Sequence, residues 1–242
     1  MAHVLLPDGR SLDVPEGTTA MDVAKLISPS LAKKAVAAEV DGRLADLTAP
    51  VPSGAKVRIV TWDDPESLEV LRHTTAHVLA QALLRLYPGT KLAIGPATED
   101  GFFYDVEPPT PLSAEDLTRI EEEMRRIVAE DLPIRRREVS REEAEAIFRE
   151  RGETYKLELL RDIPEGETIS VYEQGEFVDL CRGPHLPSTG RLRAFKLLSV
   201  SGAYFRGDPK NPMLTRIAGT AFPTEEELKQ HLKRLEEMRE RD

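Results

Sequence analysis

Residues 63–89 read DDPESLEVLRHTTAHVLAQALLRLYPG, and the rest of the chain can be laid out around them. The segment Glu66–Leu86 contains neither glycine nor proline, which predicts one continuous helix. Asp63–Pro65 before it and Pro88–Gly89 after it are typical boundary signals. Apolar residues at helical spacing give this helix a face for burial: Leu68, Leu71, Ala76, Leu79, Leu83 and Leu86.

The residues before this helix have the pattern of a small mixed domain. Two short strands, His3–Leu6 and Ser11–Val14, flank a Pro-Asp-Gly-Arg turn. A capping box at Thr19–Asp22 predicts a short helix, and Ala35–Val40 and Lys56–Thr61 predict further strands. This order fits a ubiquitin-like β-grasp fold, and any other small α+β module is the alternative.

The residues after the helix alternate between strands and capped helices. Ser113 and Ser140 each begin a capping box ahead of an amphipathic helix, and residues 168–204 show strands and turns. Thr224 caps a charged helix at the end of the sequence. Three further strands are predicted: Lys91–Ile94, Gly101–Val106 and Pro133–Val139. We therefore expect an α+β protein in three parts, residues 1–62, 63–223 and 224–242.

Composition limits what the chain can bind and where it works. The 242 residues carry a formal net charge of -10, whereas residues 1–62 hold 7 basic and 7 acidic side chains. Proteins that bind RNA by neutralising phosphates are usually basic, so an RNA partner must be argued from motifs. The single cysteine, Cys181, excludes an intrachain disulfide and fits a cytoplasmic location. We find no secretory signal and no apolar run near the roughly 18 residues of a membrane span.

Four of the six histidine and cysteine side chains fall into two closely spaced pairs. These are His73-Thr-Thr-Ala-His77 and Cys181-Arg-Gly-Pro-His185. On a helix, residues four apart point the same way, so His73 and His77 share a face. The second pair contains glycine and proline and is therefore expected in a loop, which can fold over a pocket.

Three interpretations of these pairs compete. Three imidazoles and a thiolate suit a tetrahedral zinc site, although four protein ligands leave no open position for a catalytic water. The same side chains could form a metal-free acid–base site, or they could be ordinary core and surface residues. Thr74 stands where zinc proteases carry a glutamate, which excludes that class. A nucleophilic Cys181 ranks below attack by water, because nothing near it resembles a nucleophile turn.

Other polar residues near these motifs are candidates for the same site. Asp179 lies two residues before Cys181, so on a strand the two side chains share a face. Lys156 has apolar neighbours that could lower its pKa by desolvation, although a solvated surface lysine is the commoner case. The segment Ser201–Asp208 combines two aromatic residues with Arg206, which could stack a base and hold a phosphate, or could be a plain hairpin.

Six motifs, in order along the chain, resemble the N-terminal half of bacterial threonyl-tRNA synthetases. They are His73–His77, Lys91–Pro96, Gly101–Val106, Asp179–His185, Gly202–Asp208 and Gly219–Phe222. By this resemblance, residues 1–62 are a β-grasp (TGS) domain and residues 63–223 an α+β editing domain. Residues 224–242 resemble the start of the linker helix that leads to the aminoacylation core.

The resemblance implies hydrolysis of mischarged seryl-tRNA(Thr) by water. Serine lacks only the methyl group of threonine, and one methyl gives a binding site roughly 1–3 kcal/mol of discrimination. A second, editing site can admit serine and exclude threonine sterically. Because no aminoacylation motifs follow, we expect no ATP binding in this chain, which resembles either a truncated piece or a natural standalone editing factor.

The resemblance also implies roles for individual residues. His73, Lys156 and His185 would be catalytic, orienting water and stabilising charge on the ester carbonyl. Asp179 would bind the ammonium group of the substrate. The remaining substrate-binding residues would be His77, Tyr104, Cys181, Gly95 and Arg206.

The implied cofactor and partners follow the same pattern. Alanyl-type editing domains carry a similar constellation with zinc, so zinc could bind His73, His77, Cys181 and His185, but for the threonyl type we expect no required metal. The partner would be the acceptor end of tRNA(Thr) carrying serine. The chain alone is expected to be monomeric, and the full-length protein a homodimer. Two alternatives are a non-catalytic module that grips the acceptor end and a zinc-dependent alanyl-type editing domain.

Overall fold

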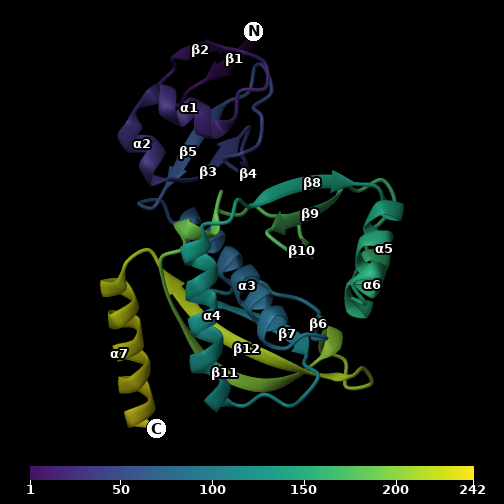
Figure 1. Ribbon diagram of the computed structural model, residues 1–242. Helices are drawn as coiled ribbons and strands as arrows, with labels where there is room; N and C mark the ends of the chain where they lie inside the picture. Colours follow the sequence, from purple (N-terminus) through teal and green to yellow (C-terminus); the bar gives the residue numbers. More distant parts are fainter.

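The computed structural model describes residues 1–242 and contains two domains and a C-terminal helix (Figure 1). Helices and strands are mixed throughout, which confirms the α+β prediction. The N-terminal domain lies at one end of the second domain, and the last helix, α7 (Glu225–Arg241), runs along its side (Figure 1). None of the helices combines the length and the apolar character needed to cross a membrane.

The N-terminal domain is built around a short helix held against a small sheet. Its elements are β1 (Ala2–Leu5), β2 (Ser11–Val14), α1 (Ala20–Ile27), α2 (Pro29–Lys34), β3 (Ala35–Val40), β4 (Arg43–Ala45) and β5 (Val57–Thr61). The strands β4, β3 and β5 pair antiparallel, and a parallel bridge from Leu5 to Lys56 joins the β1–β2 hairpin to them. The predicted capping box is formed, because Thr19 and Asp22 each accept the other's backbone N–H at 3.1 Å.

The second domain consists of two antiparallel sheets arranged about a central helix. The helices are α3 (Glu66–Leu86), α4 (Leu117–Glu130), α5 (Arg141–Glu150) and α6 (Thr154–Arg161). One sheet has the order β11 (Ala194–Tyr204), β12 (Met213–Phe222), β7 (Phe102–Glu107), β6 (Lys91–Leu92). The other has the order β10 (Phe177–Leu180), β9 (Ile169–Gln174), β8 (Arg135–Val139). Short 3-10 turns lie at Ala114–Asp116, Thr189–Arg191 and Phe205–Gly207.

Helix α3 occupies the predicted residues and is buried around most of its circumference. Leu71, Leu79 and Leu83 are fully buried in a core shared with strands β7 and β12 and helix α4. Polar residues of the same helix are buried as well, including Thr74 and His77. A helix packed on most sides is a rigid platform, so the side chains that it projects into the protein have well-defined positions.

Helix α6, which carries Lys156, was not predicted from the sequence. It has only eight residues, and its N-cap residue Glu153 makes no side-chain capping bond. Tertiary contacts hold it instead: the Glu153 carboxylate accepts the N–H of Leu92 at 3.0 Å, and Tyr155 packs against Phe205. Its helical conformation therefore depends on contacts distant in sequence, which local propensity cannot reveal.

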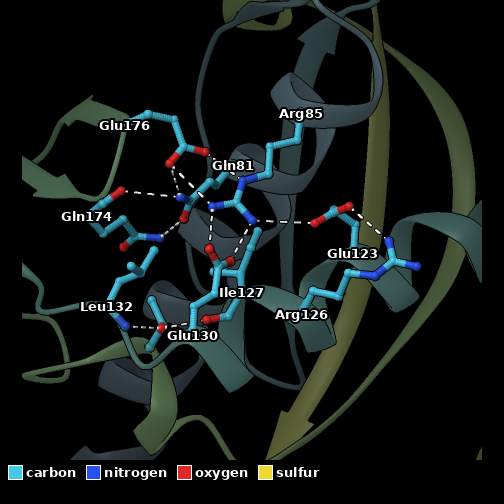
Figure 2. Close-up of polar contacts among 10 residues, drawn as sticks. Gln81, Arg85, Glu123, Arg126, Ile127, Glu130, Leu132, Gln174 and Glu176 are labelled. Carbon is cyan, nitrogen blue, oxygen red and sulfur yellow. Dashed lines mark hydrogen bonds and ion pairs between the residues drawn. The ribbon is translucent and has the colours of Figure 1, made fainter.

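An ionic network fixes the far end of α3 to its neighbours (Figure 2). Arg85 binds Glu130 of α4 and Glu176 of the β9–β10 turn, each at 2.6 Å. Beside it, the side-chain amides of Gln81 and Gln174 are joined by a 2.7 Å hydrogen bond. The network links α3 and α4 to the hairpin whose second strand, β10, leads into the Cys181 loop (Figure 2).

We expect Arg85→Ala to lower the free energy of unfolding by about 1–2 kcal/mol, because it removes several ion pairs from a partly buried network. Arg126→Ala is the matched control. Its side chain is 66% exposed and pairs only with Glu123, so a loss of less than about 0.5 kcal/mol is expected. Urea unfolding at low and high salt measures the free energy of unfolding of both variants. Equal losses for the two variants would contradict the stabilising role given to the Arg85 network.

Candidate active site

Three imidazoles converge where helix α3 faces the Cys181–His185 loop. His73 and His77 project from the same side of α3, and His185 lies over both rings. The ring centroids of His185 are 4.4 Å from His73 and 4.1 Å from His77. His77 and His185 are buried, whereas His73 is partly exposed. The four-residue spacing of each pair thus brings its members to one place.

The Cys181 thiol lies between two of these imidazoles. Its Sγ is 3.3 Å from Nε2 of His73 and 3.2 Å from Nε2 of His185. Burial raises the pKa of Cys181 to about 12, so the thiol stays protonated near neutral pH. A protonated thiol is a poor nucleophile, which argues against covalent catalysis by Cys181.

Hydrogen bonds to Thr74 define the tautomer of His185. The Thr74 hydroxyl donates to the carbonyl of Val70 at 2.8 Å, which uses its only proton. It therefore accepts from Nδ1–H of His185 at 3.0 Å and from the backbone N–H of Leu186 at 3.1 Å. Burial lowers the pKa of His185 well below its ordinary value, so the ring is neutral and its Nε2 lone pair faces Cys181.

The Asp179 carboxylate is the centre of a second, buried cluster. It lies 2.7 Å from Nζ of Lys156 and 3.2 Å from Nε2 of His77, and it accepts the Tyr104 hydroxyl at 2.6 Å. Burial alone would raise the pKa of Asp179, but Lys156 and His77 outweigh it and hold that pKa below its ordinary value. Because protein groups surround both oxygens, the carboxylate orients Lys156 and His77 and has little capacity left for a substrate ammonium group.

A cavity of about 400 Å³ opens between these clusters. Its lining includes His73, His77, Gly95, Lys156, Asp179 and Cys181, together with Ile94, Pro96, Leu159, Ile163, Thr168, Ser170, Leu180 and Arg182. Gly95 lies against the buried Tyr104 ring, where an added Cβ would come within 2.1 Å of Cδ2. Only glycine fits this wall without displacing the ring that contacts Asp179.

The structure separates Arg206 from the other predicted site residues. Its guanidinium binds the Asp162 carboxylate and the Glu158 carbonyl, and it does not line the cavity. Sequence reasoning also overlooked residues that matter to the site's geometry. The sequence around Thr74 shows only that the glutamate of zinc proteases is missing there, and Asp46 of the N-terminal domain carries no local signal at all.

The His73, His77, Cys181 and His185 group is close enough to hold a metal ion, with ligand atoms all within 4.8 Å of one another. Tetrahedral zinc with nitrogen and sulfur ligands needs separations of roughly 3.3–3.6 Å, and both Sγ–Nε2 distances are near this range. Nδ1 of His77 is buried without a hydrogen-bond partner, as an unused ligand atom would be. The donor set therefore fits zinc. Four protein ligands would leave no open position, so such an ion would hold the loop and helix together.

Glu153 is a buried carboxyl group one helical turn before Lys156. Burial raises its pKa to about 7 from an ordinary value of 4.5. Between pH 4.5 and about 7, Glu153 is therefore protonated in the folded protein but ionised in the unfolded chain. Protonated Glu153 favours the folded state fully below pH 4.5, and this contribution is lost as the pH rises through about 7.

We expect Glu153→Gln to be more stable than the wild type at pH 8 by roughly 1–3 kcal/mol and nearly equal to it at pH 4. Glutamine keeps the oxygen that accepts the Leu92 N–H but cannot ionise. Urea unfolding across this pH range measures the difference. A stability difference independent of pH would show that Glu153 titrates normally.

The domain families that match the chain agree with this architecture. Residues 2–61 match the TGS domain, which confirms the β-grasp prediction. Residues 169–218, which include Asp179 and the Cys181–His185 loop, match the threonyl and alanyl tRNA synthetase second additional domain.

Individual relatives carry the comparison over the whole chain. All 242 residues match the N-terminal region of threonine--tRNA ligases, with 60% identity to that of Rubrobacter xylanophilus and 52% to threonine--tRNA ligase 1 of Bacillus subtilis. The relative from Geobacillus sp. is 53% identical over the same length. These findings confirm the predicted resemblance. The chain spans only 37–38% of the length of these relatives.

Proposed function

We propose that this chain is an editing hydrolase that removes serine from mischarged seryl-tRNA(Thr). The observation that carries the proposal is the cavity itself. Its lining includes both His73 and Lys156, and Lys156 is paired with the Asp179 carboxylate. The cavity lies in the second domain, of which residues 169–218 match the threonyl and alanyl tRNA synthetase second additional domain. The cavity volume of about 400 Å³ suits an aminoacyl group on a terminal ribose.

The chemistry that these residues would perform is ester hydrolysis by water. Burial lowers the pKa of His73, so its imidazole is neutral and can accept a proton from the attacking water. The ammonium group of Lys156, oriented by Asp179, would stabilise the negative charge that develops on the carbonyl oxygen. The protonated His73 would then return the proton to the departing ribose oxygen, which leaves free serine and intact tRNA.

His185 and Cys181 would act in support of His73. Neither is charged near neutral pH, and Cys181 connects the two imidazoles through its position between them. This arrangement limits the orientations of the His73 ring, which is the partly exposed member of the group. Catalysis benefits from such support because an acid–base group must lie within hydrogen-bond reach of its substrate.

We expect the chain to deacylate seryl-tRNA(Thr) and to spare threonyl-tRNA(Thr). His73→Ala should lower the rate by about 10²–10⁴-fold through loss of the base, and Lys156→Ala by about 10²–10³-fold through loss of charge stabilisation. His3→Ala and Lys25→Ala, at exposed positions of the N-terminal domain, are matched controls that should retain full rate. Release of labelled serine measures all five proteins. Full activity in both site variants would refute the assigned roles.

We expect this activity to survive removal of metal. The residues proposed to carry the chemistry are a neutral imidazole and an ammonium group, and neither needs an ion. Dialysis against a strong chelator, with residual zinc determined by mass spectrometry, tests this expectation. A loss of activity that zinc restores would instead favour a zinc-dependent, alanyl-type editing domain, and deacylation of mischarged tRNA(Ala) would identify it.

A further inference from the structure

One carboxylate of the N-terminal domain reaches into the candidate active site. Asp46 follows strand β4 and is only 6% exposed. Its Oδ1 accepts the backbone N–H of His185 at 2.7 Å, and its Oδ2 accepts the hydroxyl of Tyr172 at 2.7 Å. Both donors belong to the second domain, beside which the N-terminal domain lies (Figure 1). The contact therefore joins the two domains at the loop that carries Cys181 and His185.

The loop is shaped around the same hydroxyl group. Tyr172 is buried, and its ring lies 4.5 Å from the His185 imidazole. A Cβ at Gly183 would approach the Tyr172 hydroxyl to 1.8 Å, and Gly183 has a φ of +76°. The loop can wrap around this hydroxyl only because residue 183 is glycine.

The two ends of His185 are thus fixed by different domains. Thr74 of helix α3 accepts the imidazole Nδ1–H, and Asp46 of the N-terminal domain accepts the backbone N–H. An apolar residue at position 46 would leave the buried N–H of His185 and the hydroxyl of Tyr172 without this acceptor, which is unfavourable. Asp46 accepts hydrogen bonds from both groups and thereby constrains the position of the loop backbone at His185.

We propose that Asp46 is a positioning residue of the active site, through which the β-grasp domain holds the Cys181–His185 loop against helix α3. The proposal rests on the editing function proposed above for its effect on catalysis. The hydrogen bond itself can be tested without that function. Asp46 contacts neither the substrate cavity nor the proposed reacting groups, so it acts through the loop.

The main experiment compares Asp46→Ala, which removes the acceptor, with Asp46→Asn, which keeps an oxygen for the His185 N–H. We expect Asp46→Ala to lower kcat for seryl-tRNA(Thr) deacylation by about 10- to 100-fold, with KM nearly unchanged, because small displacements of reacting groups have effects of this size. Asp46→Asn should restore most of the rate. Asp41→Asn is the matched control, since Asp41 is an exposed aspartate of the same domain that accepts the N–H of Lys56.

A second readout does not depend on hydrolysis. Cys181 is the only cysteine, so its rate of alkylation in the presence of a chelator reports on this loop alone. We expect faster alkylation in Asp46→Ala than in the wild type, Asp46→Asn or Asp41→Asn. If the wild type fails to deacylate seryl-tRNA(Thr), the proposed function fails, whereas this difference in alkylation would still support the positioning role.

Two results would overturn the proposal. One is an unchanged kcat together with an unchanged rate of Cys181 alkylation in Asp46→Ala. The other is an equal fall in kcat and an equal rise in the alkylation rate in Asp46→Ala and Asp46→Asn. Should Asp46→Ala fail to fold, hydrogen exchange of the His185 amide in the wild type provides the test. Protection comparable to that of the buried amides of α3 would support the hydrogen bond to Asp46, and rapid exchange would refute it.

Discussion

The arrangement of the site depends on the contacts of the buried Asp179 carboxylate. It joins four elements, because its partners Lys156, His77 and Tyr104 lie on α6, α3 and β7 while Asp179 itself lies on β10. A buried charge is unfavourable unless it is paired and hydrogen-bonded, and removal of one partner leaves the others uncompensated. The cluster therefore sets where α6 can lie, and with it the position of the Lys156 ammonium group.

Burial has opposite consequences for the two halves of the site. Around Asp179 it strengthens an ion pair, which keeps a positive charge on one wall of the cavity. Around Cys181 it suppresses charge, because it raises the pKa of the thiol and lowers the pKa of each of the three imidazoles. One small cavity thus combines a fixed cation with neutral imidazoles, an arrangement that suits the proposed hydrolysis of an ester.

The connection between domains brings the β-grasp unit into contact with the candidate active site. Asp46 and Thr74 hold His185 from two sides, and Tyr172 and Gly183 give the intervening loop its shape. The Arg85 network plays a comparable part at the other end of the hairpin, where it binds the β9–β10 turn to α3 and α4 (Figure 2). The hairpin that leads into the Cys181–His185 loop is therefore held at both ends by contacts from outside it.

The sequence by itself determined the features that depend on neighbouring residues. The span of α3, the capping box at Thr19 and the common face of His73 and His77 follow from local spacing, because helices and caps are short-range structures. Only the tertiary structure determined helix α6, the partners of Arg206 and the contacts of Asp46. Asp46 contacts residues 126 and 139 positions away, and no local pattern encodes such a separation. Those contacts exist only once the two domains have packed together, which is why the sequence identified side chains that meet at the candidate site but not what holds them in place.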